Sequence, residues 1–65
     1  MNLESIQQGK EYQWRGYRVR AVSPPFRIKD WHGDQVWIVK VVVIEEDGSA
    51  GLPLFVYPHH LSEAD

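Results

Sequence analysis

The ten-residue run Gln35–Ile44 constrains the fold more than any other part of this 65-residue chain. Seven of its residues are β-branched and Trp37 adds an aromatic ring, so the run favours an extended backbone over a helix. Successive side chains of a strand point to opposite faces. One face would carry Trp37, Val39, Val41 and Val43, and the other Val36, Ile38, Val42 and Ile44, interrupted by Lys40.

Two largely apolar faces on one strand need two partners. Either the strand bends, so that its halves serve two packed sheets of a barrel, or the second face meets another subunit. Lys40 opposes full burial of that second face, because an unpaired buried ammonium group is costly. The self-association residues that we predict are Val36, Ile38, Val42 and Ile44.

The small size of the chain also favours self-association. A domain of this length buries only roughly 60% of the surface that its unfolded chain exposes. The sequence has no cysteine, so disulfides cannot supply the missing stability. Oligomerisation is the assistance that remains, alongside the large buried areas that eight aromatic residues can provide.

Turn residues divide the chain into short elements. Asn2 can cap a helical turn over 1–9 that Gly9 ends, with Leu3 and Ile6 on one face. Alternation and turn signals then predict strands over 11–14, 17–21, 26–29, 35–44 and 52–57. Pro58 begins a segment typical of one 3₁₀ turn that buries Leu61, and 62–65 is expected to be a tail.

Five short strands, tight hairpins, no room for a crossover helix and a late one-turn helix resemble the SH3-like small barrel, including its KOW, Tudor and chromo-like variants. The resemblance covers most of residues 10–61 and implies an all-β, five-stranded SH3-like barrel with an N-terminal helical turn and a late 3₁₀ turn. We expect one such domain over 1–65. Barrels of this kind serve many unrelated functions, so the fold assigns none.

The sequence contains little material for catalysis. Its serines have no recognisable histidine and acid partners, and its glycines form no phosphate-binding loop. His59 and His60 are adjacent, so they point apart on an extended backbone, and only His32 remains as a third imidazole. We therefore expect no catalytic residue, no metal site and no cofactor.

One alternative is enzymatic and comes from a second resemblance. Leu54-Phe55-Val56-Tyr57-Pro58 is similar to the Val-Gln-Ile-Tyr-Pro segment of the plasmid-borne type II dihydrofolate reductases, where it lines a pore formed by four subunits. That resemblance implies an oligomeric, NADPH-dependent reductase. Phe55 stands where the family has its ligand-contacting glutamine, so Val56 and Tyr57 are the useful matches.

Another alternative is nucleic-acid binding. Residues 10–29 carry six basic side chains against one acid, whereas 30–65 carry seven acids against one lysine. Such an asymmetry is typical either of a solvated surface or of a phosphate-binding strip flanked by aromatic rings. The net charge of −2 argues against the strip. Its residues would be Arg15, Arg18, Arg20 and Lys29.

Protein binding fits the remaining features best. Phe26, Arg27 and Trp31 surround an irregular connection, and aromatic and arginine side chains dominate interface energetics; the alternative is that Trp31 folds over the barrel mouth. No run reaches the ~20 apolar residues of a membrane span, and the N-terminal residues do not show a basic region followed by an apolar one. We predict a cytoplasmic, non-enzymatic binding or assembly module, of the kind carried by mobile elements, that binds itself and a protein partner.

Overall fold

The computed structural model describes residues 3–64, and within them the fold is all-β. One antiparallel sheet curls into a half-barrel, with a 3₁₀ turn before it and another near its end. None of the described helices is long and apolar enough to cross a membrane. The elements are η1 Leu3–Ser5, β1 Glu11–Trp14, β2 Tyr17–Ala21, β3 Phe26–Lys29, β4 Gln35–Ile44, β5 Ala50–Val56, η2 Pro58–His60 and β6 Leu61–Glu63.

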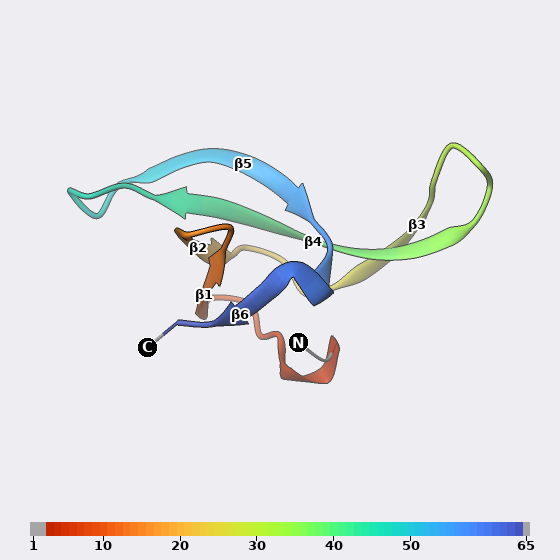
Figure 1. Cartoon of the computed structure of the whole chain (residues 1–65), viewed down its shortest axis with the longest axis horizontal. Helices are drawn as coiled ribbons and strands as arrows, with labels where there is room; N and C mark the ends of the chain where they lie inside the picture. Colours follow the sequence, from red (N-terminus) through yellow and green to blue (C-terminus); the bar gives the residue numbers. More distant parts are fainter. Residues whose placement is uncertain (1–2, 65) are drawn as a thin grey trace.

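Strand β4 is the spine of the sheet, as its β-branched run predicts. It pairs with β2, β3 and β5, and β1 and β6 continue the sheet beyond β2. Figure 1 shows β4 running across nearly the whole width of the molecule, with β5 along one half and β3 along the other. The resulting shape is elongated, 39 × 22 × 18 Å, and its accessible surface of 4715 Å² exceeds the roughly 4,300 Å² typical of a folded chain of this mass.

Strands β2 and β3 lie end to end along the same edge of β4. Ala21 is paired with Val41 and Phe26 with Ile38, so four residues of the connection face two residues of β4. Pro24 and Pro25 lie in this bulge, where they cannot donate to the ladder. The hydroxyl of Ser23 accepts a hydrogen bond from the Lys40 N–H at 3.1 Å, which satisfies the donor left by the bulge.

The core lies on the concave face of the half-barrel. Val39 and Val41 of β4 are fully buried, as their place on one face of the predicted strand requires. Each is paired across the sheet with another core-facing residue, Val56 and Leu54 respectively. The buried cluster consists of Ile6, Tyr12, Val19, Ala21, Val39, Val41, Val56 and Leu61.

Trp37 lies on the predicted face of β4 but not in the core. Its side chain is 41% exposed, although Val39, two residues later on the same face, is completely buried. The difference arises because β5 begins to cover β4 only at Val39, while residues 35–38 extend with β3 as a projecting arm (Figure 1). Periodicity identified the face correctly, but it could not show where the core ends.

The structure has a sixth strand where the sequence predicts a tail. Leu61 is 3% exposed, as expected, but Leu61–Glu63 then pair with β1 as strand β6, with Leu61 opposite Trp14. Pairing satisfies the backbone groups of these residues and extends the sheet beyond β1. The prediction of five strands is therefore wrong, because the described residues form six, with β6 as the additional one. The predicted late 3₁₀ turn is present as η2.

The hydroxyl group of Tyr12 holds the N-terminal segment against the sheet. Tyr12 is fully buried, and its hydroxyl accepts a hydrogen bond from the Gln7 N–H at 2.8 Å and donates one to the Ser5 carbonyl at 3.1 Å. Ile6, between these two residues, is buried in the core. One phenol thus satisfies two backbone groups of a segment too short to be stable alone.

The substitution Tyr12→Phe should lower the free energy of unfolding by about 1–3 kcal/mol, because it leaves two backbone groups without their partner. Urea denaturation followed by tryptophan fluorescence measures the change. Tyr17→Phe is the matched control, since Tyr17 is more than half exposed and the same substitution there should stay within about 0.5 kcal/mol. Equal losses in the two variants would contradict the anchoring role of Tyr12.

Candidate functional site

The convex side of the sheet carries an apolar surface that the chain itself only partly covers. Cross-strand pairs define it, because directly opposed residues share a face: Ile28 with Val36, Phe26 with Ile38, and Phe55 with Lys40. Val42 and Ile44 continue it along β4 and are half-buried. We call this surface the outer face; it comprises Phe26, Ile28, Val36, Ile38, Val42, Ile44 and Phe55, with Lys40 among them.

Two phenylalanines meet at the centre of the outer face. The rings of Phe26 and Phe55 approach edge to face with their centroids 6.2 Å apart, although they belong to strands on opposite sides of β4. Ile38 lies on β4 between them and is only 8% exposed. Phe55 remains 62% exposed. The aromatic pair therefore covers Ile38 and leaves ring surface of Phe55 exposed to solvent.

Of the predicted self-association residues, three keep surface that another molecule could contact and one does not. Val36, Val42 and Ile44 are half-buried and retain accessible surface, whereas Ile38 is buried within its own chain. Sequence reasoning did not include Phe55 in this surface. Phe55 alternates with Leu54 and Val56, so it lies on the other face of β5, and the register opposite Lys40 brings it beside Phe26.

The predicted protein-binding residues do not share one surface. Phe26 belongs to the outer face, while Arg27, the next residue of β3, points to the other side and is paired with Trp37. Trp31 lies in the turn between β3 and β4, where it is 88% exposed and its ring contacts that of His32 at 3.7 Å between centroids. Trp31 thus does not fold over the barrel mouth.

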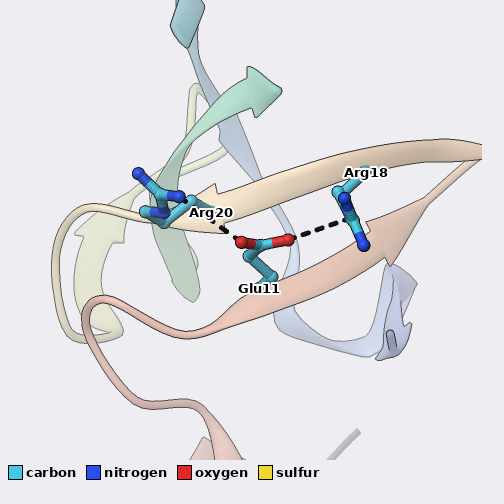
Figure 2. Close-up of polar contacts among 3 residues, drawn as sticks. All are labelled: Glu11, Arg18 and Arg20. Carbon is cyan, nitrogen blue, oxygen red and sulfur yellow. Dashed lines mark hydrogen bonds and ion pairs between the residues drawn. The ribbon is translucent and has the colours of Figure 1, made fainter. Parts of the chain in front are cut away.

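Three of the predicted basic residues lie together on the hairpin of β1 and β2. Figure 2 shows Glu11 between Arg18 and Arg20, and its two carboxylate oxygens pair with them at 2.9 and 3.4 Å. Arg15, at the tip, lies over the Trp14 ring at 5.1 Å from its centroid. The shared carboxylate lowers the net charge of this group and holds both guanidinium groups of β2 in place.

Lys29 lies far from that hairpin. It is paired with Gln35 at the start of β4, whereas β2 enters the sheet with Val19 opposite Val43. Eight residues of strand separate the two places, roughly 26 Å at the usual rise per residue. The structure therefore does not bring the four basic residues into one strip.

The three histidines lie in two places, His32 in the turn before β4 and His59 and His60 in η2. His59 and His60 contact each other edge to face at 4.3 Å, and Tyr57 stacks on His59 at 5.6 Å. No group of three His, Cys, Asp or Glu side chains among residues 3–64 is placed to hold a metal ion.

The loop between β4 and β5 holds the carboxyl group of Asp47 in its charged form. The Ser49 hydroxyl donates a hydrogen bond to this carboxylate, and the Ser49 N–H donates a second one. Both hydrogen bonds lower the pKa of Asp47, the hydroxyl more than the N–H.

The segment Leu54–Pro58, which resembles the reductase pore segment, divides between the two sides of the sheet. Val56 is buried in the core, Phe55 faces outward and Tyr57 leads from β5 into η2. Comparison of the chain with models of known protein families, with curated proteins and with solved structures found no match. The candidate site is therefore inferred from the structure of this chain alone. The outer face is the largest group of accessible apolar side chains that the strand pairing brings together.

Substitution of the shared carboxylate tests whether the pairs in Figure 2 are structural. Glu11→Gln should change the free energy of unfolding by no more than about 1 kcal/mol, because both arginines are largely solvent-exposed and such pairs contribute little. Thermal and urea denaturation measure this. Arg15→Gln, at the same hairpin but outside the pairs, is the control. A loss of several kcal/mol in Glu11→Gln alone would show that the carboxylate supports the hairpin.

Proposed function

We propose that this chain is a small, non-enzymatic protein-binding and assembly module that associates with itself through the outer face. The observation that carries the proposal is the exposed aromatic pair of Phe26 and Phe55 at the centre of an apolar surface on β3, β4 and β5. Charged residues are depleted at the centre of protein interfaces and aromatic residues enriched. Lys40 lies among these residues and Arg20 is opposite Val42 at the edge of the surface; the stems of both side chains can lie along apolar surface with their charged groups in water.

Energetic considerations support burial of this face. Phe55 leaves 62% of its side chain exposed, on the order of 120 Å² for an aromatic ring system. Removing that area from water contributes about 3 kcal/mol before the costs of association. Each copy of a two-fold dimer contributes the same surface, so the gain is doubled. A chain with so few fully buried side chains stands to benefit from such a contact.

The proposal includes a fold type. Strand order β6-β1-β2-β4-β5, with β3 continuing β2 and a 3₁₀ turn between β5 and β6, supports assignment to the SH3-like small barrels. In this interpretation β2 and β3 together correspond to one interrupted strand of a five-stranded barrel. Members of this architecture serve as binding modules of many kinds, so the type is compatible with the proposed function but does not specify a partner.

Light scattering across a concentration series tests the proposal directly. The wild-type chain should show a mass above that of one copy at micromolar concentrations, and Phe55→Arg should shift it to a single copy, because it places a second positive charge beside Lys40 at the centre of the face. The exposed side chain makes the substitution compatible with the fold.

Leu52→Arg is the matched control for that experiment. Leu52 is 83% exposed in the same strand but lies outside the outer face, so this variant should associate like the wild type. A wild-type chain that stays a single copy at high micromolar concentration would contradict self-association. So would equal effects of the two substitutions.

A further inference from the structure

A stretch of β4 has an edge that no described strand covers. β5 pairs with β4 from Ile44 to Val39 and ends at Val56. If the pairing continued, Pro58 would lie opposite Trp37 and would be the next residue to exchange hydrogen bonds with β4. Pro58 has no N–H, however, and it begins η2. Residues 35–38 are therefore paired with β3 on one side only among the described strands.

Alternation shows which backbone groups face this edge. The carbonyl and N–H of Lys40 both point to the side of β2 and β3, where they bond Val22 and Ser23. The backbone groups of every second residue share that direction, and the Asp34 carbonyl accordingly accepts a hydrogen bond from Asp30. The N–H and C=O groups of Gln35 and Trp37 point the opposite way, toward the uncovered edge.

An apolar pocket lies beside these groups. Its volume is about 340 Å³, within the range of ligand-binding pockets. One wall is β4 itself, and the others come from η1 and from the start of η2, which the core holds in place through Pro58 and Leu61. Trp37 and Tyr57, both about two-fifths exposed, supply its aromatic surface. The lining residues are Leu3, Gln35, Val36, Trp37, Tyr57, Pro58 and His59.

Two basic side chains of β3 lie on the same face of the sheet as Gln35 and Trp37 of the pocket. The Arg27 guanidinium lies over Trp37, 5.5 Å from the ring centroid, and donates a hydrogen bond to the Gln35 side-chain oxygen at 3.1 Å. Lys29 is paired with Gln35 on the same face, and no lining residue is acidic. An occupant with a carboxylate would therefore meet a cation held over the wall of the pocket.

We propose that this edge binds an extended segment of a partner protein as an added strand, with an apolar side chain in the pocket and, two residues away, an acidic side chain directed toward Arg27. Main-chain hydrogen bonds to Gln35 and Trp37 supply affinity, and the pocket and Arg27 supply specificity. The spacing follows because alternate residues of a strand share one face. The site uses the edge of β4 and shares Val36 with the outer face.

Nuclear magnetic resonance titration tests the inference. The probe is a pool of hexapeptides with leucine fixed at the third position, glutamate at the fifth and threonine, serine or valine elsewhere; a second pool has lysine in place of glutamate. The glutamate pool should shift the amide signals of Gln35 and Trp37 and bind at least about fivefold more tightly than the lysine pool. Arg27→Gln should remove that preference.

Two variants at one position separate backbone from side-chain recognition. Gln35→Pro removes the edge-facing N–H and should weaken binding about five- to tenfold, whereas Gln35→Ala keeps the N–H and should bind more tightly than Gln35→Pro. Thermal denaturation of both checks that the fold persists. Equal binding by the two variants would overturn strand addition.

Three further outcomes are decisive. Absence of amide shifts with either pool at millimolar concentration overturns the proposal. Shifts of the Gln35 and Trp37 amides on concentrating the Phe55→Arg variant alone would also overturn it, because a second copy would then occupy the edge without using the outer face. Phe55→Arg, which tests the outer face, should leave peptide binding unchanged, so that failure of one site does not imply failure of the other.

Discussion

The structure depends on the fact that strand β4 is longer than the hydrophobic core that packs against it. Ten residues of extended chain span roughly 33 Å, yet the concave core includes this strand only from Val39 onward. The strand continues past the core with β3 as its partner, and this extension makes the molecule 39 Å long. The outer face and the uncovered edge lie on or beside this strand because β2, β3 and β5 each pair with only part of its length.

The covering of β4 explains why its two faces differ. On the concave side Val39 and Val41 meet the residues of β2 and β5 and are completely buried, so this side supplies stability. On the convex side no described element packs over the sheet, and the side chains cover one another through the Phe26 and Phe55 pair. An apolar face that is covered only by its own side chains is suited to contact with another molecule.

Local sequence patterns predicted where the strands lie in the chain, but they predicted less well how the strands pair and which side chains are buried. β-branched composition located β4, alternation located the β1 and β2 hairpin, and Pro24 and Pro25 marked the break before β3. The missing strand, β6, has three residues and no β-branched side chain, so only its long-range pairing with β1 makes it a strand. The exposure of Trp37 was equally hidden, because it depends on where β5 ends.

Sequence patterns likewise placed most of the candidate site residues on strands but could not predict which residues of other strands they contact. Alternation could already separate Phe26 from Arg27, since adjacent strand residues face opposite sides, but it could not show that Phe26 would meet Phe55 or that Arg27 would lie over Trp37. Nor could it show that Glu11 takes up both Arg18 and Arg20. Each of these contacts joins residues from different strands, and the register that creates them is a property of the assembled sheet.

The uncovered edge of β4 also shows how the fold limits unwanted association. Long exposed edges invite pairing with other chains, and natural sheets shorten or obstruct them. Here β5 covers most of the edge, and Pro58 ends that cover without offering an N–H of its own. What remains is a few residues of edge beside a pocket, with Arg27 above it. Such a length is too short to template an extended sheet, but it suffices to fix the register of one added segment whose side chains match the pocket.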